Sequence, residues 1–328
     1  MILAGDIGGT KTRIALFTLE TGKLVQRAKK IFPSKDYPSL EAVLTDFTAA
    51  YPAALTAACF GVAGPVIDDT VKTPNLPWFV DGRTLARQLG VDSVALLNDL
   101  EATGYGAGTL NSSEFSVLNV GSCDPRANMG LIAAGTGLGE AILYPAAGAY
   151  RVLASEGGHA DYAPHTPQHI ELLSYLAARF GHVSYERVVS GPGIFNIYNF
   201  LKDSGSYEVP AWLPDRLAKQ DPTAVISLAA LAGEAEICVQ ALDIFASSYG
   251  AEAGNLALRA KALGGVCVGG GIAPKILKKL LDGTFMKAFV GKGRYAELLA
   301  RIPVQVILNE ETALRGAAYY GAHAQDRS

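Results

Sequence analysis

The stretch Gly5-Asp6-Ile7-Gly8-Gly9-Thr10-Lys11-Thr12 decides the fold of this 328-residue chain. Residues 2–4 before it are apolar, and residues 13–17 after it continue with strand-forming side chains and no helix start signal. The pattern therefore predicts a β-hairpin with two glycines at its tip. The dinucleotide-binding turn and the P-loop both run from a strand into a helix, and neither motif fits here.

Glycines at the tip allow the positive-φ backbone in which N–H groups converge on an anion. Thr10 and Thr12 add hydroxyl donors, and Asp6 is placed to face a metal ion. An ordinary Gly-Gly turn without a ligand is the commoner alternative, and this stretch alone leaves it open.

A second stretch repeats the pattern. Residues 129–143 read MGLIAAGTGLGEAIL, which predicts two apolar strands around Gly135, Thr136, Gly137 and Gly139. Two phosphate-type hairpins in one chain indicate two related lobes that face a shared nucleotide. A third cluster, Gly269-Gly270-Gly271, follows the apolar run 265–268 and would let a flat ring lie against backbone; we expect a helix to begin at Pro274. Between the second and third clusters, Gly191-Pro192-Gly193 is expected to break the chain before residues 194–201.

Composition limits the class of protein. With 49% hydrophobic residues, 18% charged residues and a net charge of -3, we expect a globular chain long enough for two domains. No Lys/Arg-dense face is predicted, which disfavours a nucleic acid partner. The four cysteines show no CxxC spacing, there is no signal-peptide pattern, and no apolar run reaches the ~20 residues of a membrane span. We therefore expect a cytoplasmic protein with no membrane partner.

Strand and helix patterns alternate along the first hundred residues. Strands are predicted at 23–32 and 94–97, a buried strand at 57–65 that ends in a glycine-proline stop, and a helix at 40–50, which indicates an α/β fold. Residues 73–78 (TPNLPW) form a loop that holds Asn75 beside an aromatic ring, with a rigid turn as the alternative. Asn98-Asp99 ends a strand at the edge where open α/β sheets bind ligands, yet Asn98 with Glu101 also matches a capping box.

Taken in order, GDIGGTKT (5–12), AAGTGLG (133–139) and VCVGGGIAPK (266–275) resemble the sugar kinase, actin and Hsp70 superfamily. The resemblance is closer to the bacterial glucokinase family, compact ATP-dependent hexokinases, and it runs from Ile2 to about Ala322. Four further stretches carry it: LLNDLEA (96–102), SEGGHADYAP (155–164), HVSYERVVSGPGIFNIY (182–198) and ETALRGAA (311–318).

The resemblance implies a two-lobed, ribonuclease H-like α/β fold with a nucleotide cleft between the lobes. It implies a small discontinuous domain at 1–108 and 305–328, a large domain at 109–304, and a homodimer. ATP phosphates are expected over Gly8, Gly9 and Thr10 and over Gly135, Thr136, Gly137 and Gly139, with Gly269, Gly270 and Gly271 also at the nucleotide. Asp6 would position Mg²⁺, through water.

The resemblance also implies a sugar site. Asp99 matches the catalytic base, aimed at the 6-hydroxyl of glucose. The implied substrate-binding residues are Asn75, Asn98, Asp99, Gly137, Glu156, His159 and Glu186. From the residues alone, Glu186 is an ordinary surface charge and His159 is either a structural histidine or part of a metal site with Asp161, His165 and His169.

The sequence departs from one related family in a feature that bears on zinc binding. The GGTKT and TPNLPW stretches also resemble the repressor, open reading frame and kinase family, which carries a cysteine-rich zinc motif after such a histidine. Residues 168–181 contain no cysteine, so no zinc is expected.

Three alternatives stay open. The first is a kinase for another hexose or an amino sugar. The second is a non-catalytic sugar-sensing protein such as a repressor, disfavoured because no helix-turn-helix pattern precedes Ile2. The third is an actin-like filament protein or chaperone ATPase, disfavoured by the polar sugar set.

Overall fold

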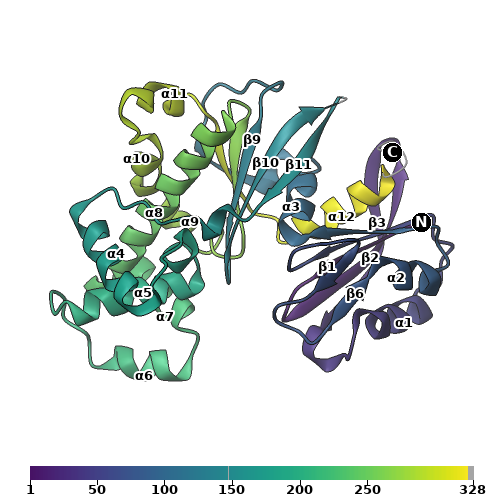
Figure 1. The fold of residues 1–328 in the computed structure, drawn as a ribbon, viewed down its shortest axis with the longest axis horizontal. Coiled ribbons are helices and arrows are strands. Elements are labelled where there is room, and N and C mark those ends of the chain that lie inside the picture. Colours follow the sequence, from purple (N-terminus) through teal and green to yellow (C-terminus); the bar gives the residue numbers. More distant parts are fainter. Residues whose placement is uncertain (147, 324–328) are drawn as a thin grey trace. The chain divides into compact units, whose positions relative to one another are not determined.

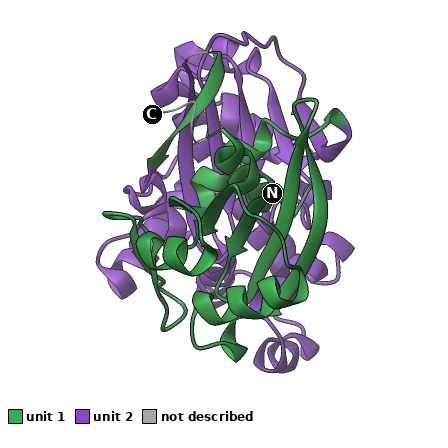
Figure 2. Cartoon of the chain, turned by 90° about the vertical axis from the view of Figure 1, so that its right-hand side faces the viewer, with its two compact units in different colours: residues 1–112, 148–154, 309–328 green, residues 113–147, 155–308 purple. Residues whose placement is uncertain are grey.

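The computed structural model describes residues 1–146 and 148–323. The chain forms two compact units (Figure 2). Unit 1 comprises residues 1–112, 148–154 and 309–328, and unit 2 comprises residues 113–147 and 155–308. Unit 1 is therefore built from three separate parts of the chain.

A five-stranded sheet forms the centre of unit 1, in the order β3-β2-β1-β4-β7. Its strands are β1 (Ile2–Ile7), β2 (Lys11–Glu20), β3 (Lys23–Pro33), β4 (Ala57–Val62) and β7 (Val94–Asn98). β2 pairs antiparallel with β1 and β3, whereas β1, β4 and β7 run parallel. The predicted hairpin, the alternating elements and the α/β class are confirmed.

Helices cover both faces of this sheet, and successive side chains of β1 point to alternate faces. Leu3 and Ile7 pack with α1 (Leu40–Ala50) and α2 (Gly82–Leu89), while Ile2 and Ala4 pack with α3 (Asp99–Ala107) and α12 (Thr312–Ala322). Figure 1 shows the two helix pairs on opposite sides of the sheet. A small hairpin of β5 (Thr70–Lys72) and β6 (Phe79–Asp81) precedes α2, and a short turn of 3-10 helix, η1 (Ser34–Asp36), follows β3.

Unit 2 also holds a sheet, with the strand order β10-β9-β12-β13-β8. The strands are β8 (Phe115–Asn119), β9 (Met129–Ala134), β10 (Leu138–Ala146), β12 (Gly265–Gly269) and β13 (Val304–Ile307). β9 and β10 form the second predicted hairpin. β12 lies parallel to β9, so Gly269 and Ala134 end at the same edge. β11 (Ala149–Ser155) follows β10, and most of its residues belong to unit 1.

The helices of unit 2 build its core around α8 (Glu236–Ala260), a 25-residue helix. The others are α4 (Pro167–Phe180), α5 (Gly191–Asp203), α6 (Trp212–Lys219), α7 (Pro222–Ala232), α9 (Leu277–Leu280), α10 (Thr284–Val290) and α11 (Ala296–Ala300). Short 3-10 turns are η2 (Ser112–Glu114), η3 (Gly157–His159), η4 (Tyr185–Arg187) and η5 (Gly293–Tyr295). Within the described residues, no single helix is long and apolar enough to span a membrane; α7 and α8 qualify only as a pair bent by 103°.

Two local predictions in unit 2 are wrong. No helix begins at Pro274, because residues 270–276 form turns and α9 starts at Leu277. Gly191-Pro192-Gly193 does not interrupt the chain but forms the first turn of α5, where Ser190 accepts the N–H of Gly193. Proline suits a first helical turn because its missing N–H would have no helical partner there.

Candidate functional site

The carboxyl ends of three parallel strands meet at one edge of the unit 1 sheet. Asp6 lies beside Gly61 of β4, and Val62 lies beside Asn98 of β7. Neighbouring strands are about 4.8 Å apart, so Asp6 and Asn98 are two strand spacings from each other. α3 then carries Asp99 over β4, where a Cβ built on Gly61 would lie 2.7 Å from Ala102 Cβ and 3.9 Å from Asp99 Cα.

The Gly8–Thr10 turn is tightly held at this edge. The Gly8 N–H donates to Lys11 O (3.1 Å), which leaves Gly9 and Thr10 at the tip. Ser34 braces the turn from η1: its Oγ donates to Gly8 O (2.7 Å) and its N–H donates to Thr10 O (3.0 Å). Ser34 Oγ also shares a hydrogen bond with Thr12 Oγ1 (3.0 Å), and both residues are fully buried. No sequence signal pointed to Ser34.

Asn75 lies against the tip of this turn. A Cβ built on Gly9 would be 2.8 Å from Asn75 Cβ, so only glycine allows this approach. The loop that carries Asn75 is closed by hydrogen bonds from Thr73 to Trp78 O and Leu76 O. Residues 73–78 are thus a rigid turn, as the simpler alternative predicted, and that turn places Asn75 beside Gly9.

Asp6 is paired with Arg13 from the next strand. Arg13 Nη1 donates to Asp6 Oδ2 at 2.8 Å, and the Asp6 side chain is 15% exposed. Burial raises the pKa of Asp6, while the Arg13 guanidinium acts in the opposite direction. The ion pair therefore favours a charged carboxylate at the base of the Gly8–Thr10 turn.

Asn98 and Asp99 begin α3. Asn98 Oδ1 accepts the Glu101 N–H (2.6 Å), and Glu101 Oε2 accepts the Asn98 N–H (3.1 Å), so the capping box is complete. The capping interpretation of Asn98 is confirmed; a sugar contact would use its amide N–H groups. Asp99 is exposed, and its Oδ1 accepts the Leu100 N–H at 2.9 Å.

In unit 2, Glu186 is tied to the second glycine hairpin. The turn closes with the Gly135 N–H donating to Gly137 O (2.8 Å). Glu186 Oε2 accepts the Leu138 N–H (2.9 Å), and a Cβ on Gly137 would lie 2.5 Å from that oxygen. The structure thus brings Glu186 to the hairpin of Gly135, Thr136, Gly137 and Gly139.

The third glycine cluster lies at the same edge of the unit 2 sheet. Gly270 has φ +82°, and a Cβ there would lie 2.7 Å from the Ala134 carbonyl carbon. Tyr249 of α8 links the two motifs, because its hydroxyl donates to Gly269 O (3.2 Å) and accepts the Ala134 N–H (3.2 Å). Sequence reasoning missed Tyr249, because it lies in an Ala-rich segment that carries none of the glycine or polar motifs.

The Glu156–His159 segment turns over β10 as η3. A Cβ on Gly158 would be 2.9 Å from the Leu138 carbonyl carbon, so the turn rests directly on the strand. Glu156 and His159 are exposed.

The neighbouring histidines pair in other ways. His165 contacts Ser247 (3.0 Å) and His169 (3.2 Å), and Asp161 contacts His182 (2.8 Å). Among the described residues no group of three or more His, Cys, Asp or Glu side chains is arranged to hold a metal ion.

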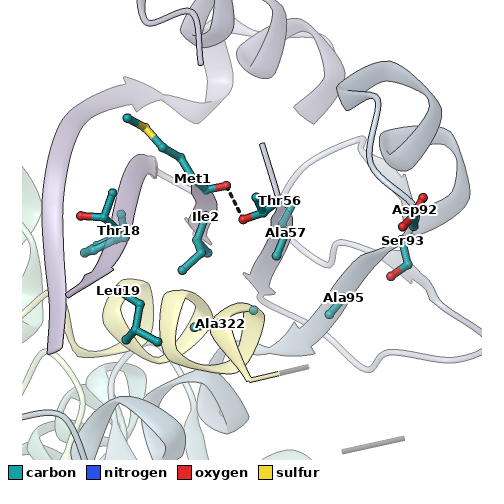
Figure 3. A pocket seen from close by; sticks show the side chains of 13 residues that line it. Met1, Ile2, Thr18, Leu19, Thr56, Ala57, Asp92, Ser93, Ala95 and Ala322 are labelled. Carbon is teal, nitrogen blue, oxygen red and sulfur yellow. Dashed lines mark hydrogen bonds between the residues drawn. The ribbon is translucent and has the colours of Figure 1, made fainter. Parts of the chain in front are cut away.

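A pocket of about 390 Å³ opens elsewhere in unit 1 (Figure 3). It is lined by residues that begin the parallel strands, including Ile2, Ala57 and Ala95, and Thr56 donates to Met1 O beside it. Because Asp6 and Asn98 lie at the opposite ends of those strands, this pocket is separate from the candidate site.

Known proteins resemble the chain over its whole length. The family model described as Glucokinase matches residues 3–324. A glucokinase from Synechocystis sp. is 42% identical over 98% of this chain and 98% of its own. A crystal structure of a glucokinase from an Antarctic psychrotroph superposes with a TM-score of 0.87 at 33% identity, covering 98% of both chains.

A more distant structure shares the fold alone. The ROK family glucokinase from Streptomyces griseus, solved with glucose and AMPPNP, gives a TM-score of 0.63 at 21% identity over 98% of this chain and 99% of its own. These likenesses confirm the predicted sugar kinase, actin and Hsp70-like fold. The family match and the 42% identity confirm the resemblance drawn from the sequence: the chain belongs to the glucokinase family.

Proposed function

We propose that this chain transfers the γ-phosphoryl group of ATP to the 6-hydroxyl of glucose, with Asp99 as general base. One observation carries the proposal: in a chain of this family, Asp99 follows a strand that ends at the same sheet edge as the Gly8–Thr10 turn. The ROK family glucokinase from Streptomyces griseus, solved with glucose and AMPPNP, supports the same pair of substrates on this fold.

The start of α3 orients the proposed base. The Leu100 N–H holds one oxygen of the Asp99 carboxylate, and the capping box fixes the backbone before it. In phosphoryl transfer such a carboxylate receives the proton of the attacking hydroxyl, while most of the catalysis comes from positioning and electrostatic stabilisation. We propose that Asn75, Asn98, Gly137, Glu156, His159 and Glu186 bind the sugar, because each sugar hydroxyl needs a donor or an acceptor.

The nucleotide residues are proposals of the same kind. Gly8, Gly9, Thr10, Gly135, Thr136, Gly137 and Gly139 would hold phosphate oxygens, with Gly269, Gly270 and Gly271 also at the nucleotide. Asp6 fits Mg²⁺: it is one carboxylate, stabilised by Arg13, beside a glycine turn. Mg²⁺ in nucleotide sites commonly takes one or two carboxylates plus substrate phosphates. When bound, the ion offsets negative charge on the phosphates.

The Asp99→Asn variant tests the base. The amide keeps the size of the side chain and an acceptor for the Leu100 N–H, but it cannot take the proton. We expect kcat to fall by ~10² to 10⁴, the usual contribution of a general base, while calorimetry with glucose shows a Kd within about threefold of wild type. Asp92→Asn is the matched control, since Asp92 is exposed near the opposite end of β7. An unchanged kcat in Asp99→Asn would refute the assignment.

A panel of sugars tests the substrate. Epimers and amino sugars differ from glucose at one position, so a kinase for another hexose would show a higher kcat/KM for that sugar than for glucose. Product formation measured with ATP and Mg²⁺, against the same reaction with ADP or polyphosphate, tests the phosphoryl donor.

Three further assignments accompany this function. We propose that the small and large domains, expected at 1–108 with 305–328 and at 109–304, correspond to units 1 and 2. We propose a cytoplasmic homodimer, consistent with four cysteines that form no disulfide. Light scattering after size-exclusion chromatography measures the oligomeric state.

A further inference from the structure

A buried charged cluster lies behind the Glu156–His159 turn. Glu140 of β10 is 2% exposed and Glu252 of α8 is fully buried. Arg259 Nη2 donates to Glu140 Oε2 at 3.2 Å and also pairs with Glu252. Two buried carboxyl groups therefore share one guanidinium.

This cluster touches the proposed sugar site directly. A Cβ on Gly157 would lie 2.5 Å from Glu140 Oε2, so the carboxyl group packs against the backbone of the turn. Gly157 follows Glu156 immediately and precedes His159 by two residues. The Glu140 carboxyl group therefore packs against the turn that carries both proposed sugar ligands.

The hydrogen bonds of the cluster favour one proton on Glu140. Within the described structure its Oε1 is buried and has no hydrogen-bond partner, which is costly for an ionised carboxylate. Asn255 Nδ2, in contrast, donates to Glu252 Oε2 at 2.8 Å. Glu252 thus accepts hydrogen bonds from both the Arg259 guanidinium and the Asn255 amide, whereas Glu140 accepts from Arg259 over a longer distance. A proton on Glu140 lets that carboxyl group donate to its ionised neighbour.

The other titratable groups around the cluster come from η4, from α8 and from Lys292, the residue before η5. Burial raises the pKa of Tyr185 in η4 and of Tyr249 in α8, so both stay neutral. Lys292 donates to Asn255 Oδ1 at 2.7 Å, and burial lowers the pKa of Lys292. Burial, and then the nearby Glu252 charge, raise the pKa of Glu140 to about 8. The proton is therefore present at neutral pH and lost in mildly alkaline solution.

Resting on the proposed function, we propose that Glu140 is a positioning residue for sugar binding: its protonated carboxyl group holds the Glu156–His159 turn on β10, and loss of that proton weakens the hold on glucose. An ionised Glu140 would place a second buried negative charge beside Glu252 with one shared guanidinium. Such an uncompensated buried charge is relieved by movement of the strand or of the turn.

The test compares wild type with Glu140→Gln and Glu140→Ala from pH 6.5 to 9.0. The readouts are KM and kcat for glucose, and Kd for glucose by calorimetry. For wild type we expect KM and Kd to rise about tenfold between pH 7 and pH 9, as expected for a single proton lost near pH 8, with kcat changing less than about twofold. Glu140→Gln, neutral at every pH, should hold a KM within about twofold of the wild-type value at pH 7. Glu140→Ala should have a raised KM at every pH.

Glu234→Gln is the matched control, because Glu234 is a half-exposed partner of Arg216 on the surface of the same unit. Its pH profile should follow wild type. A Glu140→Gln profile that rises with pH as wild type does would overturn the proposal, and so would a wild-type Kd that is flat with pH. If the wild-type chain binds glucose but does not phosphorylate it, the proposed function fails while the Kd profiles still decide on Glu140. A chain that binds no glucose overturns both.

Discussion

The contact between α3 and α12 allows a test of whether the packing of α3 positions Asp99, the proposed general base. The two helices meet through glycines, so their backbones touch. A Cβ on Gly316 would lie 2.5 Å from Gly106 N and 2.8 Å from the Ala102 carbonyl carbon. A Cβ on Gly106 would lie 2.7 Å from the Thr312 carbonyl carbon. Ordinary contact begins at 3.4 Å. The added Cβ would also overlap the Ala102 carbonyl oxygen, so Gly316→Ala forces the helices apart by at least about 1 Å, the gap between clash and normal van der Waals contact.

That displacement acts on Asp99, because α3 begins there. A misplacement of about 1 Å is enough to cost ~10² in rate, so we expect kcat for glucose phosphorylation to fall about 100-fold. Overpacking typically costs about 1–3 kcal/mol, and the clash here is between backbones, which favours the upper part of that range. The higher helix propensity of alanine returns up to about 1 kcal/mol. A net loss of about 2 kcal/mol lowers the apparent Tm by roughly 4–8 °C.

The assay pairs steady-state kinetics with thermal unfolding followed by fluorescence. Gly108→Ala is the matched control, because it adds the same methyl group at the end of α3, where the nearest atom is 3.8 Å away and φ is -69°. We expect the control to keep both kcat and Tm. A Gly316→Ala variant with wild-type kcat and Tm would refute the link between this crossing and the base. A lowered Tm with unchanged kcat would refute the catalytic part alone.

Two further predictions concern buried polar groups. Ser34→Ala removes the Ser34 hydroxyl from Gly8 O and from Thr12 Oγ1, and each buried oxygen left without this partner costs about 1–3 kcal/mol of stability. Because these bonds hold the Gly8–Thr10 turn, we expect a raised KM for ATP and little change in KM for glucose. Ser174→Ala is the control, because it removes a hydroxyl that donates to Ile170 O in the same helix. Equal KM values for ATP in the two variants would contradict the role of Ser34 in holding the Gly8–Thr10 turn. Burial, with His165 nearby, lowers the pKa of His169 to about 4, from 6.5 in the unfolded chain. Between pH 6.5 and 4 the unfolded state binds the extra proton, so stability falls with falling pH by up to about 1.4 kcal/mol per unit. The free energy of unfolding, measured with urea, should fall less steeply with falling pH for His169→Gln than for wild type. Parallel pH profiles of the two proteins would contradict a lowered pKa for His169.

The sequence predicted what local patterns determine. Both hairpins, the strand that ends at Asn98 and the capping box with Glu101 depend on residues a few positions apart, and all are confirmed. Ser34 is 26 residues from Gly8, and Glu140 is over a hundred residues from Glu252, so only the folded chain brings them together. The two predictions that depended on proline failed in opposite directions: Pro192, expected to break the chain, lies in the first turn of α5, and Pro274, expected to begin a helix, lies in a turn. Proline suits both settings, and hydrogen bonds from other parts of the chain decide between them. The roles of individual site residues, Asp99 first among them, stay predictions.

The three-part construction of unit 1 has a consequence for how the protein is made. One face of its sheet is covered by residues 3–96 alone. The other face needs Leu314, Ala317 and Ala318 of α12, which leave the ribosome after all of unit 2. During synthesis the apolar side formed by Ile2, Ala4 and Phe17 therefore lacks the α12 half of its cover and has only α3 against it while roughly two hundred residues are added, at ~5–20 residues per second. For those seconds the nascent chain exposes part of an apolar sheet face, which is the kind of surface that aggregates and that chaperones cover.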